Sequence, residues 1–343
     1  MARWNNDYNM SAHPEILDAI VKADGSYAGY GTDEWCDKAK EEIRKHLGKA
    51  DADIHFLVGG TQTNYIVIAA ALRPYQGIIS ATTGHIALHE TGAIENTGHK
   101  VITAEGENGK LNAEIVREIA KEYYDSDIQE HVVQPKMVFL SFPSEYGTIY
   151  TKKELEDIRA VCDEYKLYLY VDGARLGYGL AAQGCDVTIE DLAKLTDAFY
   201  IGGTKCGALF GEAVVLLNDE LKDHFRSHIK QNGAMLAKGW LLGVQYYTLF
   251  KDGLYFKITS RAIIEAMRIK EAFKAKNIPF AFESFTNQQF VVLDNSQIEK
   301  IGRTQIYEYD SRIDKEHHVI RFCTSWSTKS EDVDKLIEDI NNL

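Results

Sequence analysis

Leu167-Tyr168-Leu169-Tyr170-Val171-Asp172-Gly173-Ala174-Arg175 is an apolar run that ends in an aspartate and continues into a glycine turn. The run Tyr200-Ile201-Gly202-Gly203-Thr204-Lys205 has the same form and ends in a lysine, 33 residues after Asp172. Short apolar runs closed by turn residues are typical of strands buried on both faces. Ligands of parallel α/β sheets collect at the carboxyl ends of the strands. We therefore expect Asp172 and Lys205 to lie together at one edge of a parallel sheet.

Strand-like and helix-like segments alternate along the first 250 residues or so. Such alternation is typical of a mainly parallel sheet with helices on both faces, so we predict an α/β fold. Besides the run before Lys205, the expected strands are 54–58, 77–80, 101–103, 137–140, 167–172 and 213–217, and the expected helices are 61–72, 111–123 and 152–165.

The pattern changes after about residue 250. A long helical stretch at 254–276 is followed by runs typical of strands and then by a closing helix; the later elements are expected at 280–283, 289–293, 319–323 and 330–340. We predict a large α/β domain over residues 1–250 and a small α+β domain over residues 251–343.

Composition narrows the class of protein. The net charge of −13 argues against a nucleic-acid partner, because nonspecific binding needs Lys and Arg to neutralise phosphates. The five cysteines are scattered without a CxxC pair, which fits a reducing compartment and predicts neither disulfides nor a zinc site. The N-terminus lacks the apolar core of a signal peptide, and no run of about 18 apolar residues exists. We expect a cytoplasmic protein with no membrane partner.

The order of Asp172 and Lys205 points to a cofactor. A strand-end aspartate followed by a strand-end lysine is typical of enzymes that hold pyridoxal 5'-phosphate (PLP) on the lysine as a Schiff base, with the aspartate paired to the pyridinium nitrogen. A lysine that attacks an aldehyde has to be neutral, and the flanks of Lys205 are poor in charge. The other interpretations are an aspartate that caps its own turn and a lysine in a polar loop; the apolar flanks disfavour the second.

Two further segments fit a phosphorylated ring. In Gly59-Gly60-Thr61, between an expected strand and helix, backbone N–H groups and the helix dipole favour an anion, although a plain turn with a Thr cap is the commoner use of such residues. His85 can stack on a flat cofactor or can be a structural histidine. His85 and His89 also have the spacing of metal ligands, but no third ligand lies nearby, and we expect no metal.

Two arginines are candidates for binding a carboxylate. Arg175 offers a two-pronged donor for a substrate carboxylate, or forms a surface ion pair. Arg321 lies inside the apolar run 319–323, where an arginine needs a carboxylate partner from the protein or from a substrate. We favour a substrate carboxylate as the partner of Arg321.

Together these residues resemble the low-specificity L-threonine aldolase group of the β-eliminating lyase superfamily, which are fold-type I PLP enzymes. The resemblance runs over nearly the whole chain, and Asp172-Gly173-Ala174-Arg175-Leu176 is identical to that family's most specific motif. The other similar segments are Asn6-Asp7-Tyr8, Tyr30-Gly31-Thr32-Asp33, Gly59-Gly60-Thr61 with Asn64, Gly84-His85-Ile86 with Glu90, Thr204-Lys205 and Arg321-Phe322-Cys323-Thr324.

The resemblance implies a seven-stranded, mainly parallel fold-type I sheet, a PLP cofactor, and cleavage of β-hydroxy-α-amino acids such as L-threonine or L-allo-threonine to glycine and an aldehyde. It also implies a homodimer or homotetramer with sites shared between subunits. The residues that it implies are Lys205 and His85 for catalysis; Gly59, Gly60, Thr61, His85, Asp172, Thr204 and Lys205 for the cofactor; and Asn6, Tyr30, Ser144, Glu145, Arg175 and Arg321 for the substrate.

The chain departs from the family at two places. Residues 141–147 stand where the family has Glu-Asn-Thr-His-Asn, so the second active-site histidine is missing, and Asn6 replaces a serine. The base on the β-hydroxyl is therefore open: His85, a water that it orients, or a replacement in Ser144-Glu145. Alternative functions are β-elimination that releases ammonia and a keto acid, a catalytically idle PLP-fold binding protein, and a nucleotide-binding enzyme, although GxGxxG and Walker spacings are absent.

Overall fold

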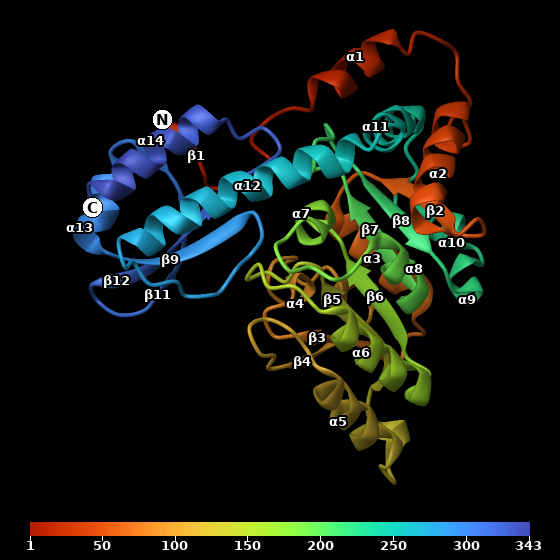
Figure 1. Cartoon of the computed structure of the whole chain (residues 1–343). Coiled ribbons are helices and arrows are strands. Elements are labelled where there is room, and N and C mark those ends of the chain that lie inside the picture. The colour runs from red at the N-terminus through yellow and green to blue at the C-terminus, as the bar shows by residue number, and fades with distance from the viewer.

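The computed structural model describes residues 1–343. A seven-stranded sheet with the order β2-β8-β7-β6-β5-β3-β4 forms its centre (Figure 1). Six strands run in one direction, and only β8 is antiparallel to its neighbours. This confirms the mainly parallel seven-stranded sheet that the sequence predicts. The strands are β2 (Asp53–Leu57), β3 (Gln76–Ala81), β4 (Lys100–Ala104), β5 (Gln134–Ser141), β6 (Tyr168–Asp172), β7 (Ala198–Gly202) and β8 (Glu212–Leu216).

Helices cover both faces of this sheet, so its strands are buried on both sides. Along β5, Val138 and Leu140 join a hydrophobic core on one face, while Met137 and Phe139 join a second core on the other face. Near-continuous apolar runs are the sequence signature of such strands. The helices are α2 (Glu34–Leu47), α3 (Gly60–Ala71), α4 (His85–Leu88), α5 (Ala113–Tyr124), α6 (Lys152–Tyr165), α7 (Leu176–Leu180), α8 (Ile189–Leu195), α9 (Asp219–Lys222), α10 (Phe225–Gln231) and α11 (Trp240–Phe250), with two short 3₁₀ helices, η1 (Glu95–Thr97) and η2 (Gln129–His131).

A smaller lobe contains a three-stranded antiparallel sheet with the order β11-β12-β9. The strand expected at 280–283 is reduced to one bridge between Phe280 and Val291. Phe282 instead stacks on Tyr146 of the large lobe, with ring centroids 3.7 Å apart. The elements of this lobe are α12 (Leu254–Ala275), β9 (Gln288–Asp294), α13 (Asn295–Gly302), β10 (Gln305–Ile306), β11 (Glu308–Arg312), β12 (His317–Cys323) and α14 (Ser330–Asn341).

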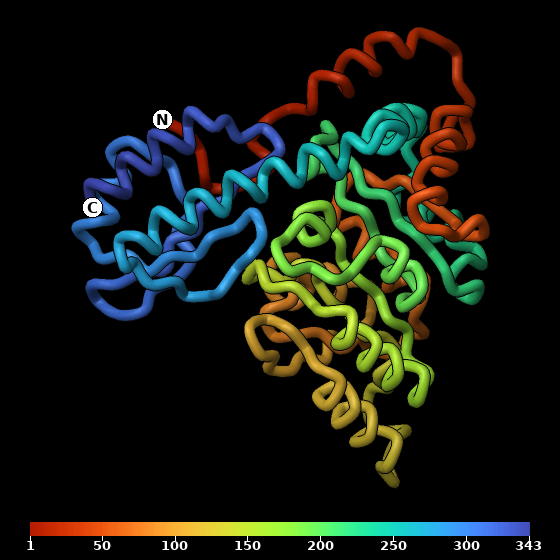
Figure 2. The backbone as a smooth tube through the Cα atoms, in the orientation of Figure 1, coloured from red at the N-terminus to blue at the C-terminus, as the bar shows by residue number.

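The N-terminal residues pack with this smaller lobe, although the chain continues from there into the large one. Strand β1 (Ala2–Arg3) pairs with β10, and the buried Trp4 indole donates a hydrogen bond to Gln305 at 2.9 Å. The chain then crosses to α2 through α1 (Pro14–Lys22), while both chain ends stay in the small lobe (Figure 2). The division of the chain near residue 250 stays a prediction.

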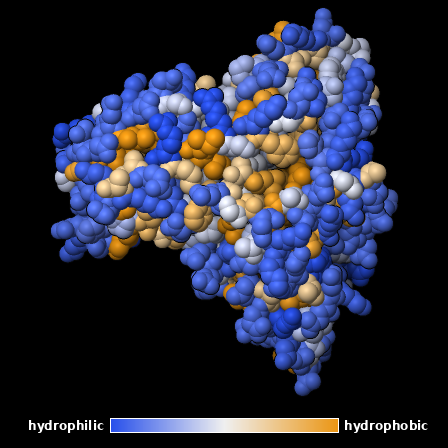
Figure 3. Space-filling model, in the orientation of Figure 1, coloured by the Kyte–Doolittle hydropathy of each residue, from blue (hydrophilic) through white to orange (hydrophobic).

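Helix α12 connects the two lobes. Its first half packs in the large core through Ile258 and Ala262, and its second half packs in the small core through Ile269 and Phe273. Apolar residues gather on the surface where the lobes meet, over α12 and α7 (Figure 3). None of the helices is long and apolar enough to cross a membrane.

Candidate active site

A cavity of about 390 Å³ lies between the two lobes. The turns at the carboxyl ends of the sheet strands form one wall, and the small lobe forms the other. His85, Glu145, Arg175, Lys205 and Arg321 all line it, so the structure brings five of the predicted site residues together. These five side chains place two guanidinium groups, an amine, a carboxyl group and an imidazole in one cavity.

The amine of Lys205 forms no hydrogen bond or ion pair with the rest of the chain. The turn that carries it is held by its backbone: the Tyr178 hydroxyl donates to the Lys205 carbonyl at 2.7 Å. Burial, followed by the charge of Arg175, lowers the pKa of Lys205, although Asp7, Asp172 and Glu212 oppose this shift. The environment therefore favours the neutral, nucleophilic amine.

Asp172 ends β6 and is 5% exposed. One carboxylate oxygen accepts hydrogen bonds from the Ala174 N–H at 2.9 Å and the Tyr200 hydroxyl at 2.6 Å. The aspartate thus caps its own turn as well as lying near Lys205. The turn after Asp172 requires glycine at position 173, because a Cβ there would lie 1.9 Å from the Tyr200 carbonyl oxygen.

A buried polar network joins Asp172 to His85. The Asn64 amide donates both to Asp172 Oδ2 at 3.0 Å and to Glu90 Oε1 at 2.7 Å. Glu90 Oε1 is also 2.8 Å from His85 Nδ1, and the Tyr170 hydroxyl donates to Asn64. The side chain of Glu90 is fully buried, so it fixes the ring of His85, which itself faces the cavity. Asn64 and Glu90 are not among the predicted site residues. The sequence signal for them is their place in the two segments that resemble the family, Gly59-Gly60-Thr61 with Asn64 and Gly84-His85-Ile86 with Glu90.

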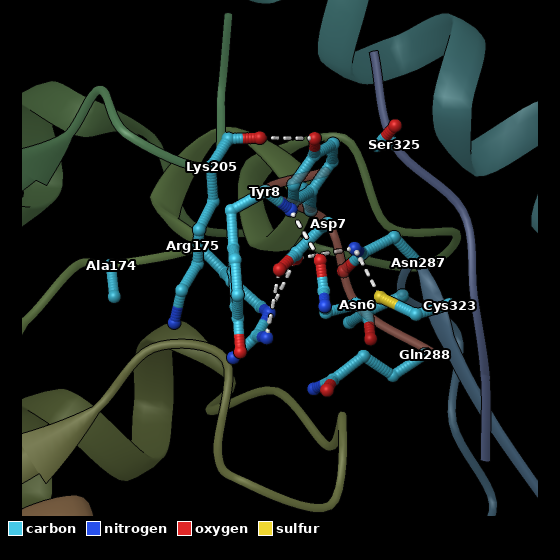
Figure 4. Close-up of polar contacts among 12 residues, drawn as sticks. Asn6, Asp7, Tyr8, Ala174, Arg175, Lys205, Asn287, Gln288, Cys323 and Ser325 are labelled. Carbon is cyan, nitrogen blue, oxygen red and sulfur yellow. Dashed lines mark hydrogen bonds and ion pairs between the residues drawn. The ribbon is translucent and has the colours of Figure 1, made fainter. Parts of the chain in front are cut away.

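Arg175 has a carboxylate partner within the chain. Its Nε and one Nη donate to Asp7 at 2.7 and 3.0 Å, and Asn287 adds a third donor to Asp7 at 2.9 Å (Figure 4). Burial alone would raise the pKa of Asp7, but the charges of Arg175 and Lys205 and the hydrogen bonds hold it below its ordinary value. The sequence offered only one signal for Asp7, its place beside Asn6 in the N-terminal motif.

Arg321 has no carboxylate within ion-pair distance. Its Nη atoms donate to Gln288 Oε1 at 3.3 Å and to the Asn5 carbonyl at 3.0 Å, and its Nε is buried without a partner. Arg321 is half-buried, and with only neutral acceptors its charge is not compensated by a carboxylate of the chain. This is the condition under which Arg321 is suited to a carboxylate that enters the cavity.

The Gly59-Gly60-Thr61 turn begins α3 without a side-chain cap. Its first N–H groups are left without protein acceptors, and the Thr61 hydroxyl is exposed. A Cβ on Gly60 would lie 3.0 Å from the Tyr200 hydroxyl, which itself contacts Asp172. The Thr204 hydroxyl accepts from the Gly211 N–H at 3.0 Å, within the turn that carries Lys205.

The structure separates the two residues of the Ser144-Glu145 pair. The Ser144 hydroxyl is bonded to Thr148 at 2.6 Å and does not line the cavity. Glu145 faces the cavity, and its Oε1 accepts from Ser141 at 2.6 Å and from the His85 N–H at 2.9 Å. Burial raises the pKa of Glu145.

Besides Ser144, two more of the predicted substrate residues lie outside this cavity. Asn6 caps its own turn by accepting from the Tyr8 N–H at 3.1 Å. Tyr30 is 46% exposed and lies against Arg226 and Lys230, at a different, small cavity. No cluster of three His, Cys, Asp or Glu residues has the arrangement of a metal site.

Glu212 is a buried acid that was not predicted, although it starts the apolar run of β8. Its Oε2 accepts from the Gly203 N–H at 3.1 Å. Burial raises its pKa to about 8, against the opposing effects of Thr204 and Lys205. It therefore supports the backbone of the Lys205 turn.

Comparisons with known proteins agree over most of the chain. A family model described as beta-eliminating lyase matches residues 10–296. The chain is 30% identical over 331 residues to a low specificity L-threonine aldolase of Pseudomonas aeruginosa, covering 95% of this chain and 93% of that protein. A solved structure of Leishmania major threonine aldolase is 43% identical with a TM-score of 0.97, covering 100% and 99% of the two chains. Aspartate aminotransferase of Thermus thermophilus, 15% identical with a TM-score of 0.70 over 97% and 89% of the chains, shares the fold.

Proposed function

The chain belongs to the β-eliminating lyase family, and on this premise we propose that it is a PLP-dependent aldolase that cleaves β-hydroxy-α-amino acids of the L-threonine or L-allo-threonine type to glycine and an aldehyde. The observation that carries the proposal is the pairing, in one cavity, of the Lys205 amine, which has no hydrogen bond or ion pair within the chain, with a guanidinium at Arg321 that lacks a carboxylate. Burial lowers the pKa of Lys205 and so increases the share of the neutral, nucleophilic amine. An amino acid substrate supplies that carboxylate.

The residues fit the cofactor on observations of this chain. The unpaired Lys205 amine is the point of attachment, and Asp172 is the acceptor for the pyridinium N–H. The uncapped start of α3 at Gly59, Gly60 and Thr61 supplies free N–H groups for the phosphate, where a Cβ on Gly60 would fill space next to Tyr200. Thr204 is a further phosphate ligand in this proposal. When bound, PLP supplies an electron sink for the pair released at the α-carbon of the substrate.

The side chains divide the remaining work. Arg321 binds the substrate carboxylate, and Arg175 adds the donor that Asp7 leaves free. Asp172, a strand-end carboxylate, keeps the proton on the pyridinium nitrogen. His85, fixed by Glu90, lies against the ring and positions the reacting groups. We further propose that the active form is a homodimer or homotetramer in the cytoplasm, in which Tyr30 serves a site on another copy.

A direct assay tests the proposal. Purified protein with added PLP is offered L-threonine, L-allo-threonine and phenylserine, and glycine is measured against ammonia. We expect glycine and an aldehyde without ammonia. Ammonia and a keto acid would favour β-elimination, and no turnover with an intact cofactor band would favour an idle binding protein. Lys205→Ala has to abolish the visible absorption band of lysine-bound PLP, and a band that survives this change would contradict the cofactor assignment.

A further inference from the structure

We propose that Glu145 takes the proton from the β-hydroxyl of the substrate when the carbon–carbon bond breaks. This inference rests on the aldolase function proposed above and names the group that the sequence leaves open. In this proposal a carboxylate from the turn after β5 is the general base in place of the missing second histidine.

The position of Glu145 is the first argument. Its side chain lies on the wall of the cavity that contains Lys205 and Arg321. Two donors hold one of its oxygens, the Ser141 hydroxyl at 2.6 Å and the His85 N–H at 2.9 Å. The second oxygen accepts no hydrogen bond from the protein. One oxygen therefore fixes the group, and the other is free for a substrate hydroxyl.

The electrostatic setting is the second argument. Burial, with a further effect of the Asp172 charge, raises the pKa of Glu145, while the Ser141 hydroxyl and His85 lower it. A carboxylate with a raised pKa is a stronger base than an exposed one. The same two donors keep it oriented in either protonation state.

The competing groups are less suited. His85 Nδ1 is bound to the buried Glu90, so only Nε2 of this ring remains to compete, and in the proposed function the ring is assigned to the cofactor. The Ser144 hydroxyl is bonded to Thr148, away from the cavity. Tyr146 stacks on Phe282, and burial raises its pKa.

His89 and the acids of β11 also line the cavity, but from its outer rim. His89 is an exposed residue, and the partial burial of its ring, followed by the charge of His85, lowers its pKa. Glu308 and Asp310 lie on a strand that is exposed throughout. These groups have the solvation of surface residues, whereas Glu145 is held inside the cavity.

Cleavage by this route needs no further reagent. The β-hydroxyl proton moves to the carboxylate of Glu145, and the electron pair of its O–H bond becomes the second bond of the aldehyde C=O. The Cα–Cβ pair remains on Cα, where the PLP of the proposed function would stabilise it. A proton then returns to Cα to complete glycine, either from Glu145 itself or from solvent to which Glu145 gives up its own proton, so that Glu145 ends as the carboxylate with which it began.

Glu145→Gln is the decisive variant, because a Gln carbonyl oxygen still accepts from Ser141 and the His85 N–H but cannot take a proton. Cleavage of L-threonine or phenylserine is measured beside two readouts that need no β-hydroxyl. These are exchange of the glycine α-hydrogen in D₂O, followed by NMR, and glycine affinity, followed by absorption titration. Glu164→Gln, on the exposed surface of α6, is the matched control, while Ser144→Ala and His89→Asn test the two rival groups.

We expect kcat for cleavage to fall by about 10²- to 10⁴-fold in Glu145→Gln, the usual contribution of general-base catalysis. Glycine exchange and glycine affinity stay close to the wild-type values, and Glu145→Asp, which keeps a carboxylate, retains part of the cleavage activity. The Glu164→Gln control cleaves like the wild type, and neither Ser144→Ala nor His89→Asn reproduces the loss.

Several results would overturn the inference. Unchanged cleavage in Glu145→Gln excludes the role, and a parallel loss of cleavage and glycine exchange makes Glu145 a positioning residue instead. If His89→Asn loses as much cleavage activity as Glu145→Gln, His89 at the rim of the cavity is the proton acceptor instead. The proposed function fails separately, when the wild-type protein itself forms no glycine from any of the three substrates.

Discussion

Asp7 and Arg175 lie 168 residues apart in the chain and form a two-pronged ion pair, with N–O distances of 2.7 and 3.0 Å. The pair ties the N-terminal segment to the turn that follows β6. The pair also distinguishes the two arginines of the cavity. The charge of Arg175 is compensated by Asp7, whereas the charge of Arg321 is not compensated by any carboxylate of the chain.

Asp7→Asn is expected to destabilise the protein strongly. The change leaves the guanidinium of Arg175 in the interior without its counter-charge, and breaking a buried pair in this way costs about 3–5 kcal/mol. Urea unfolding of the cofactor-free protein at neutral pH measures the difference. Glu164→Gln is the matched control, because its ion pair with Arg117 is exposed and such pairs contribute about 1 kcal/mol or less. Equal effects of the two changes would contradict this account.

The same pair predicts a pH dependence. The folded pKa of Asp7 lies below its ordinary value, so its contribution is present above the unfolded pKa and is lost as the pH falls through the folded one. We expect the wild type to lose more stability than Asp7→Asn between about pH 4 and the acid transition. The test is the unfolding free energy of both proteins across that range. Parallel curves would show that Asp7 does not titrate with folding.

Arg321→Gln is expected to weaken substrate binding far more than folding. Losing a buried charge partner for a carboxylate costs about 2–5 kcal/mol, or roughly 30- to 5,000-fold in KM. Because Arg321 has no ion pair in the chain, the unfolding free energy changes little. Steady-state kinetics and urea unfolding are measured side by side. Arg312→Gln, on exposed β11, is the control and keeps the wild-type KM. A large loss of stability without a change in KM would assign Arg321 a structural role.

Asn64→Ala tests the buried network. Its amide is a shared donor for Glu90 and Asp172, so the change leaves Asp172 Oδ2 without a donor and Glu90 Oε1 with His85 as its remaining partner. Unsatisfied buried groups cost about 1–3 kcal/mol each, and PLP affinity falls as Asp172 and His85 lose their connection. Tyr170→Phe removes only the hydroxyl donor to Asn64 and has the smaller effect. Chemical unfolding and PLP titration give both values; the reverse order of the two variants would be inconsistent with the network.

Glu212→Gln is expected to change how stability depends on pH. Burial raises the folded pKa of Glu212 to about 8, above its ordinary value of 4.5, so the folded state keeps a proton that the unfolded state has lost. This group therefore lowers the unfolding free energy as the pH rises from the unfolded pKa to the folded one. The difference between the wild-type and Glu212→Gln curves isolates the effect. A constant difference across that window would show that Glu212 is already ionised in the fold.

Much of the fold is readable from the sequence because burial on both faces leaves continuous apolar runs, as in β5, β6 and β7. The exposed strand β11, Glu308–Arg312, has no such signal, and a strand was expected at 280–283 because local pattern does not record the stacking of Phe282 on Tyr146. Local pattern is weakest where a partner from elsewhere in the fold decides the structure.

The same limit applies to the site. Residues at strand ends, such as Lys205, are placed by the sheet itself, and the cavity contains five of the predicted side chains. The partner of Arg175 was not predictable from spacing, since Asp7 reaches it from the start of the chain. Ser144 and Glu145 are adjacent in sequence, yet only Glu145 faces the cavity. A turn lacks the side-chain periodicity of a helix or strand, so the sequence does not indicate which of the two faces inward.

The pairing of β1 with β10 has a consequence for how the molecule is made. Strand β1 cannot pair until β10, some 300 residues further along the chain, has been synthesised, as the Trp4–Gln305 bond illustrates. During that wait the large sheet can form, because its strands are complete once residue 216 has emerged. Trp4 cannot reach its buried position before Gln305 has been made. The N-terminal segment, whose Tyr8 lines the cavity, can therefore be fixed beside the site only after β10 is present.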